Sequence, residues 1–342
     1  MQMRLGQDLC MGIGKEASWA ARPKMFKHLT VLQQSLAQIP MRRHRQELGR
    51  GQFATKSQLI HSHIGGDISW QMAFGHGDDL LASVINGDWH SQNISGLVNS
   101  LPRGTRLSWL VPDAVPDTPP PSFSLLQRFD KRDAWQHFQG LKVSRLRLTI
   151  GLGGEVVTGA TLIGKGMALA TRPVSVLGNK MPDVVANPVF NLNLAPSTLA
   201  IKPLDRASRA LQSTSDFALS HLAISVSRGG MAPLFGLSAM PPIGIADGVL
   251  AIHGHLHLLY TPSLASMLRE NQRLKMQLSV YDGSGHILVI LLPDSLVTNS
   301  DIETSSPAMP TILRVQFESR HISKSPSSTP LIALGMAELD AG

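Results

Sequence analysis

Apolar and polar residues alternate along short stretches of the chain, and glycines or prolines separate one stretch from the next. Residues 146–150 (LRLTI) and 313–317 (LRVQF) are clear examples. Alternation with a period of two predicts β-strands that have one buried and one solvent-facing side. The 30 glycines and 22 prolines are spread along the sequence, which is typical of a protein with many turns between short strands. The pattern therefore predicts a mainly β fold.

Two distant stretches share the same order of features. Residues 63–72 and 251–260 each read as a strand that contains a glycine. After a short loop, residues 78–85 and 262–269 each read as a short helix. Self-similarity of this kind is the sequence signature of a repeated structural unit.

Further matches flank these stretches in the same order. Asp78 and Ser263 are the expected N-caps of the two helices, because their side chains can accept a hydrogen bond from a free backbone N–H. The aligned flanks are residues 28–31 with 221–224, 146–150 with 313–317, and 158–169 with 328–339. Several matches in a constant order favour an internal duplication over chance similarity of β patterns.

The duplication predicts two domains in tandem. The first domain, with an N-terminal arm, covers residues 1–169, and the second covers residues 215–342. Between them, residues 170–214 are rich in Pro, Asn, Ala and Ser and read as a linker or arm. A length of 342 residues also suggests about two domains. Residues 29–39 carry both a helical and a strand pattern, and the alignment with the second copy favours a strand.

Long hairpins are expected in both copies. Residues 41–56 separate two predicted strands of the first copy, and the Gly- and Pro-rich residues 228–248 occupy that place in the second. Residues 281–286 (YDGSGH) predict a further hairpin turn. The basic residues of the first hairpin are Arg42, Arg43, Arg45, Arg50 and Lys56. Since no interleaved aromatic residues follow this single basic cluster, contact with a partner protein or with solvent is favoured over nucleic-acid binding.

Composition narrows the classes of function. Hydrophobic residues make up 43% and charged residues 16% of the chain, which is enough apolar material for packed cores. The net charge of +7 permits contact with a polyanion without requiring it. Cys10 is the single cysteine, which excludes an internal disulfide framework and any site built from several cysteines. The longest apolar run, residues 287–292, is far shorter than the ~20 residues that span a bilayer, and no secretory signal is recognisable. We expect a reducing cytosol and no membrane partner.

Catalytic and nucleotide-binding motifs are incomplete. Residues 159–165 have the glycine spacing of a phosphate-binding loop, but Gly166 follows where a metal-binding hydroxyl is needed, and the interior residues resemble a strand. Residues 12–17 resemble the start of a dinucleotide fingerprint, yet no apolar strand precedes them. No GxSxG nucleophile elbow occurs. The sequence therefore predicts no enzyme and no cofactor.

Three histidines alternate on one predicted strand of the second copy. They are His253, His255 and His257. Alternation places them on one side of the strand, where a cluster could hold a metal ion. The aligned residues of the first copy are Gly65, Asp67 and Ser69. Because these are small or polar, the simpler interpretation is a wet sheet face opposite an apolar one, with no metal.

The order of these segments resembles the tail tube (major tail) proteins of long, non-contractile-tailed bacteriophages (siphophages). The segments that carry the resemblance are residues 13–19 (IGKEASW), 42–50, 65–68 (GGDI), 78–85, 87–89 (GDW), 123–129, 138–146 (FQGLKVSRL) and 159–165 of the first copy, with residues 254–293 of the second. The resemblance spans about residues 12–339, and it depends on the order of the segments rather than on any single motif.

The resemblance implies tandem tail-tube-fold β-sandwich or barrel domains, each with one short flanking α-helix, long hairpin loops and extended arms. Proteins of this kind form rings that stack into the tail tube, whose channel delivers the genome into the host cell. Because a ring of the family presents six tube domains, two domains per chain imply a homotrimer with pseudo-sixfold symmetry. Six chains are implied if the duplication is wrong.

The implied contacts are with further copies of the chain, the tape-measure protein during assembly, tail terminator and baseplate proteins at the tube ends, and passing double-stranded DNA. The chain is then expected in the virion tail, assembled in the host cytoplasm. The 41–56 hairpin is the expected ring-stacking element. The face of Gly65 and His253 is expected to be either the lumen or the outer surface. Many phosphate contacts would retain DNA, so most Arg and Lys are expected outside the channel. A tail terminator or baseplate distal-tail protein is the alternative on the same fold.

Overall fold

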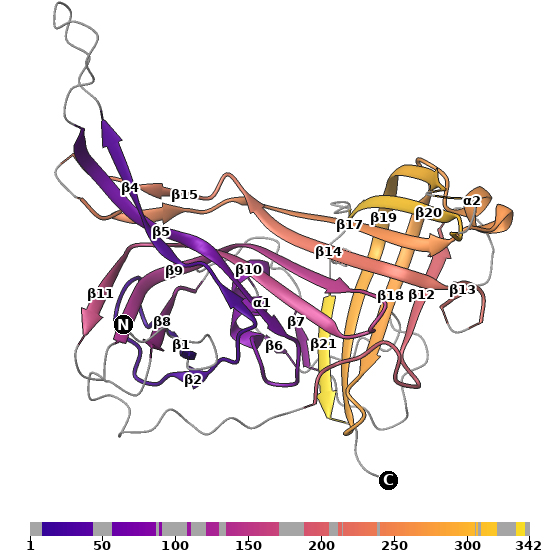
Figure 1. The fold of residues 1–342 in the computed structure, drawn as a ribbon, viewed down its shortest axis with the longest axis horizontal. Helices are drawn as coiled ribbons and strands as arrows, with labels where there is room; N and C mark the ends of the chain where they lie inside the picture. The colour runs from indigo at the N-terminus through magenta and orange to yellow at the C-terminus, as the bar shows by residue number, and fades with distance from the viewer. Residues whose placement is uncertain are drawn as a thin grey trace, which may run out of the picture.

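The fold is known from a computed structural model, drawn in Figure 1. It describes residues 9–43, 57–86, 89–90, 108–110, 121–129, 135–170, 188–204, 211–213, 215–237, 240–304, 306, 309–319 and 333–338. Within these residues the chain forms two α-helices and 21 β-strands. The mainly β fold predicted from the alternating pattern is confirmed.

The strands and helices fall into two halves along the chain. The first half contains β1 (Leu9–Lys15), β2 (Lys27–His28), β3 (Gln33–Gln34), β4 (Ala37–Arg43), β5 (Gln58–Gln71), α1 (Asp78–Ile85), β6 (Trp89–His90), β7 (Ser108–Leu110), β8 (Phe123–Phe129), β9 (Trp135–Ile150), β10 (Val156–Gly164) and β11 (Gly166–Ala170). The second half contains β12 (Thr198–Pro203), β13 (Leu211–Gln212), β14 (Leu219–Gly229), β15 (Ala232–Leu234), β16 (Gly244–Ala246), β17 (Val249–Leu259), α2 (Pro262–Met267), β18 (Arg273–Tyr281), β19 (His286–Glu303), β20 (Ile312–Ser319) and β21 (Ala333–Glu338).

The two halves have the same order of neighbouring strands. In the first half the ladders run β2–β1–β8–β9–β10–β5–β4. In the second half they run β13–β12–β18–β19–β20–β17–β14. In each half, a helix follows the second strand of the long hairpin, α1 after β5 and α2 after β17. Figure 1 shows the first half in indigo to magenta and the second in rose, orange and yellow.

The register of the two halves agrees in detail. Gly66 of β5 lies opposite Leu162 of β10, and Gly254 of β17 lies opposite Phe317 of β20. The ladder between β9 and β10 shifts register at Ser144, and the ladder between β19 and β20 shifts at Thr298. Val143 pairs with Leu162 and Val297 pairs with Phe317, so each bulge comes one residue after the β9 or β19 residue that is in line with the glycine. A side chain at Gly66 would meet the carbonyl oxygen of Ser35 at 2.6 Å. The backbone around Ser35 therefore approaches β5 so closely that only a glycine fits at position 66.

Several sequence matches outside the glycine strand are wrong. Residues 313–317 lie on β20, whose counterpart in the first half is β10, whereas residues 146–150 lie on β9. The equivalent of β14 is the segment that contains β3 and β4, because both pair with the glycine strand; it is not residues 28–31. Alternation is common to every half-buried strand, so it identifies strands without identifying their partners.

The segment expected to be a linker also differs. Residues 170–214 contain β12, which pairs with β18 over its whole length, and Phe190, which is fully buried. β12 has only six residues, begins shortly after Pro196 and ends at Pro203, so it is too short and too close to prolines to be identified from periodicity.

The helix caps differ by one or two residues from those predicted. The N-cap of α1 is Gly77 in a left-handed conformation, with no side-chain cap, and Asp78 is the first helical residue. The N-cap of α2 is Thr261, whose hydroxyl accepts a hydrogen bond from the backbone N–H of Leu264. Pro262 at the first helical position places Thr261 before the helix.

A shared sheet joins the two halves. Residues 145–150 of β9 pair antiparallel with residues 222–227 of β14, and we call this ladder the internal joint. One hydrophobic core cluster extends through both halves. Helix α1 contacts both strands of the internal joint. Beside it, the Arg228 guanidinium donates to the carbonyl oxygen of Val84 at 2.8 Å, and Lys142 forms an ion pair with Asp247 at 2.9 Å.

Candidate functional site

The solvent-facing side of the shared sheet, which we call the wet face, is continuous from β5 to β17. In the first half, Asp67 is exposed and Ser69 is half-buried on β5. Their neighbour Gly65 is buried, because a side chain there would meet Ile39 at 2.6 Å. The Thr161 hydroxyl donates to the Asp67 carboxylate at 2.6 Å. These residues are equivalent by register to the histidines of β17, as the glycine alignment predicted.

The histidines of β17 gather with one histidine that the sequence analysis did not include. His253 is exposed, while His255 and His257 are half-buried. His221 of β14 lies between the latter two, with its ring centroid 5.1 Å from each, and the His255 and His257 centroids are 5.4 Å apart. The pairing of β14 with β17 brings His221 to this face, and only knowledge of that pairing would have predicted it.

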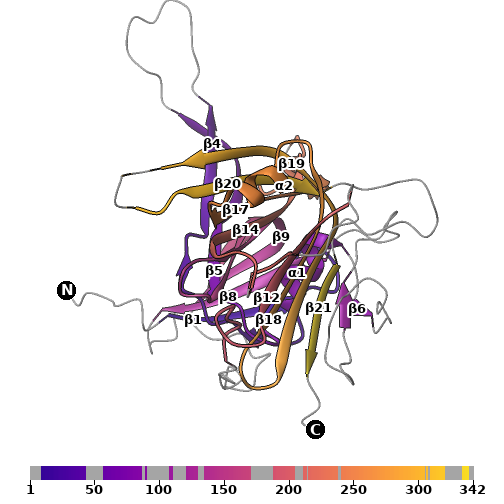
Figure 2. The same ribbon diagram turned by 90° about the vertical axis from the view of Figure 1, so that its right-hand side faces the viewer.

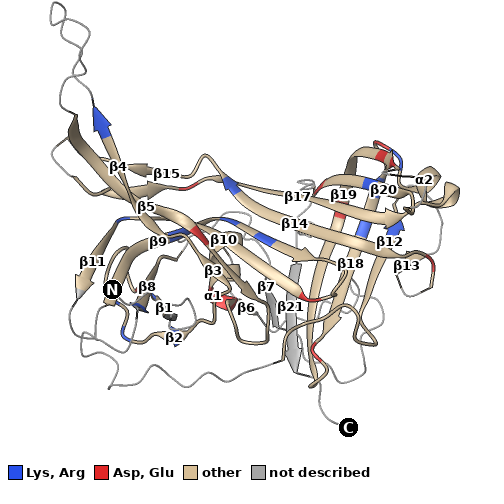
Figure 3. Cartoon of the chain, in the orientation of Figure 1, with Lys and Arg blue, Asp and Glu red and all other residues tan. Residues whose placement is uncertain are grey.

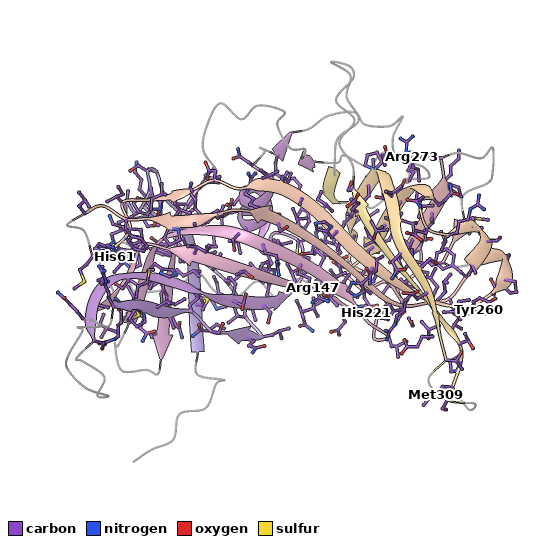
Figure 4. The ribbon with its side chains drawn as sticks, turned by 90° about the horizontal axis from the view of Figure 1, so that it is seen from above. His61, Arg147, His221, Tyr260, Arg273 and Met309 are labelled. Atoms are coloured by element: carbon purple, nitrogen blue, oxygen red, sulfur yellow. The ribbon has the colours of Figure 1, made fainter. Side chains whose placement is uncertain are left out.

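Desolvation disfavours the charged form of three of these histidines. It lowers the pKa values of His221, His255 and His257 below the usual histidine value. Neighbouring histidines lower the pKa values of His255 and His257 further. Arg147 also lowers the pKa values of His221 and His255. Arg314 lowers those of His255 and His257, whereas Glu303 raises the pKa of His257. Figure 4 shows Arg147 and His221 close together. Among the described residues, no group of three or more His, Cys, Asp or Glu side chains is placed to hold a metal ion. His221, His255 and His257 are therefore neutral and polar near pH 7.

Two arginines of β9 lie at the centre of the wet face. Arg145 and Arg147 are exposed and line two hollows, of about 350 and 340 Å³. Ala223, Ser225, His253 and His255 border the first hollow, and Ser35, Asp67, Ser69 and Thr161 border the second. Figure 3 shows this basic part of β9 and the acidic residue of β5 in the same region of the sheet. Basic residues therefore occur on this face, which the sequence analysis did not anticipate.

The predicted basic hairpin is formed by β4 and β5. Arg42 and Arg43 lie on β4 and are exposed, and the Arg42 guanidinium donates to the Ser57 hydroxyl at 3.4 Å. Arg45, Arg50 and Lys56 lie outside the described residues. In Figure 1 the two strands extend beyond the rest of the sheet.

The hairpin of the second half lies against the first. The ring of Phe235 stacks on His61 with centroids 4.4 Å apart, and the backbone N–H of Ser62 donates to the carbonyl oxygen of Met240 at 3.0 Å. Exposed apolar side chains gather on these two hairpins. They are Ile39, Met41, Ile60, Leu234, Leu237, Met240, Ile243 and Val249. This end of the molecule is thus apolar as well as basic.

The outer part of β19 forms an open sheet edge that the sequence did not predict. From Thr298 onward, the described part of β19 pairs with β20 on one side and with no described strand on the other. Figure 2 shows the β19–β20 ribbon extending away from the body. On it, Ile302 is 56% exposed. Its counterpart Leu148, on β9 in the internal joint, is only 4% exposed.

None of the helices that the structure describes has the length and apolar character needed to cross a bilayer. A comparison with curated proteins finds no match to this sequence. A comparison with protein families matches residues 6–319 to the phage tail tube protein family. The match includes both glycine strands, both helices and the internal joint. The chain therefore belongs to the phage tail tube protein family.

Proposed function

We propose that the chain is a two-domain tube subunit, of which three copies close a ring, and that the rings stack into the channel for genome delivery. Family membership indicates a structural component of the phage tail. The observation that supports three chains is the repeated order of strands, with one joint between the halves already formed inside the chain. Six units then need three internal joints and three joints between chains.

The domains that follow from the strand order differ from those expected. The first unit extends from β1 to β10 and the second from β12 to β20. The second unit therefore begins within the segment assigned to the linker. An internal duplication explains why the bulges at Ser144 and Thr298 occupy equivalent positions.

The wet face is our candidate for the lining of the channel. It is opposite the core face of the same sheet, where Ile68 and Leu256 are buried at 1% and 0% exposure, and α1 packs on β9 and β14 at the internal joint. Besides Arg145 and Arg147, its residues include Gly65, Asp67, Ser69, His253, His255 and His257, with His221 and Arg314 on either side of His257. Acidic and neutral side chains flank these two arginines on β5 and β17 and limit the number of phosphate contacts that passing DNA could make.

The hairpin end is our candidate for ring stacking. Both long hairpins end on the same side of the sheet, because β5 and β17 run in the same direction through the intervening antiparallel strands. Exchanging Arg42, Arg43 and Arg45 for Glu is expected to leave folded subunits or rings that do not elongate. Tubes of normal length from this variant would exclude the basic residues from stacking.

Negative-stain electron microscopy of the purified chain tests the proposal. We expect hollow rings and stacked tubes. In the virion, the expected partners of such tubes are the tape-measure, terminator and baseplate proteins. Single rings that never stack would favour the tail terminator or distal-tail alternative. Particles without a hollow centre at any concentration would contradict both.

A further inference from the structure

The open edge of β19 has a counterpart that is closed within the same chain. Counting from the shared bulge, Asp301 and Ile302 of β19 correspond to Arg147 and Leu148 of β9. Arg147 pairs with Ser225 of β14, and Leu148 pairs with Ile224. Asp301 and Ile302 pair only with β20 among the described strands. The second unit therefore lacks the strand that β14 provides to the first.

A second open edge has the features of the missing strand. β14 corresponds to residues 33–43, which pair with β5 as β14 pairs with β17. Through the glycine strands, Ser225 corresponds to Ala37 and Ile224 to Leu36. The outer side of β3 and β4 pairs with no described strand, and every residue of β4 is exposed.

The two edges differ in how they are protected while open. The backbone N–H of Leu36 donates to the side-chain carbonyl of Gln34 at 2.7 Å, so this edge carries a local substitute for a strand partner. Open edges with free backbone groups pair readily with other chains, and a side-chain substitute of this kind is easily displaced. On the other edge, Ile302 is exposed on the core side, in line with Leu313 of β20.

We propose that residues 299–304 of one chain pair antiparallel with residues 34–39 of a second copy, in the register of the internal joint. Asp301 then lies opposite Ala37, and Ile302 lies opposite Leu36. This inference rests on the proposed function, and it specifies the contact that closes the ring. This contact covers both open edges at once, because residues 299–304 of one copy become the neighbour of residues 34–39 of the next.

The proposed joint would differ from the internal joint in charge. At the internal joint the wet face carries Arg145, Arg147 and the histidines of β17. At the equivalent positions of the joint between chains it carries Asn299, Asp301 and Asp67, and Arg314 of β20 lies opposite Asp301. The joint between chains would therefore carry an amide and a carboxylate in place of the two exposed arginines of β9.

Disulfide trapping tests the register. In a chain with Cys10→Ser, the pair Asp301→Cys and Ala37→Cys is expected to form disulfides between chains, seen as dimers and trimers on non-reducing gels. Directly opposed residues fall within the range that a disulfide can bridge. The matched control is Arg147→Cys with Ser225→Cys, which occupies the same place in the internal joint and is expected to close only within a chain.

A shifted pair defines the negative control. Asp301→Cys with Met41→Cys is displaced by four residues along the strand, or roughly 13 Å, and is expected not to cross-link. If the Cys10→Ser parent forms rings but the shifted pair links and the aligned pair does not, the register is overturned while the proposed function stands. If rings form and neither pair links, the edge pairing itself is wrong. If the parent forms no rings, the proposed function fails, and this inference fails with it.

Discussion

Strands β9 and β19 occupy the same place in the two halves, yet their surroundings differ. β9 is covered on both sides, by β10 and by β14, whereas the outer part of β19 pairs, among the described strands, with β20 alone. The same core-facing position is therefore 4% exposed as Leu148 and 56% exposed as Ile302. Equivalent positions with unequal burial therefore mark an edge that one further strand would cover.

Truncating the two equivalent side chains separates folding from assembly. Leu148→Ala removes a buried side chain and is expected to lower the free energy of unfolding by about 2–5 kcal/mol. Ile302→Ala removes a side chain that is already solvent-exposed, so the isolated chain should change by less than about 0.5 kcal/mol. Chemical denaturation measures both. A loss of several kcal/mol from Ile302→Ala in the monomer would show that the edge is already covered.

The glycine strands give a second comparison. A side chain at Gly254 would meet the ring of Phe317 and would lie 2.7 Å from the carbonyl oxygen of Ala223. Gly254→Ala is therefore expected to cost about 1–3 kcal/mol through overpacking. The matched control is Gly159→Ala on β10, where the nearest atom is 3.8 Å away, and little change is expected. Equal losses in thermal melts of the two variants would contradict the close-approach explanation.

The helix starts of the two halves are expected to respond in opposite directions. Burial, with a contribution from Asp79, raises the pKa of Asp78 to about 6, so at pH 7.5 the folded state holds a charge that its surroundings disfavour. Asp78→Asn should stabilise the protein by about 1 kcal/mol at pH 7.5, and by less near pH 4, where the folded wild type is protonated. Thr261→Ala removes a hydrogen-bonded cap and should cost about 1 kcal/mol at either pH.

The histidine patch is expected to give the smallest effect. Because desolvation lowers the folded-state pKa values of His221, His255 and His257, the unfolded chain binds more protons below about pH 6.5, and stability falls as the pH decreases through that value. Replacing the three residues with Gln should reduce the loss of Tm between pH 7.5 and pH 5.5. An unchanged loss would show that other groups cause the pH dependence.

The sequence predicted the parts of this fold that local pattern controls. The glycine strands, the two helices and the turn at Asp282–Gly285 follow from periodicity and turn residues. The pairing of β9 with β14 could not be predicted, because strand partners far apart in sequence leave no local signal. For the same reason His221, Arg145 and Arg147 were absent from the predicted site. Each lies on a recognisable strand, and only the pairing places them beside the β17 histidines.

The open edge of β19 could not be predicted from the sequence for a related reason. Residues 286–303 form one long strand whose first part is paired on both sides, whereas its last part has a partner on one side only within the described part of the chain. The hydrophobic pattern near Ile302 is that of a half-buried strand in either case. Only comparison with the filled position at Leu148 shows that a neighbour is missing.

Electron cryo-microscopy of assembled tubes tests the central claim most directly. The account predicts a cross-section of three chains around a hollow centre, with one continuous sheet in which internal joints alternate with joints between residues 299–304 and residues 34–39. A ring of six chains, or a ring of three in which the β19 edge remains uncovered, would contradict it.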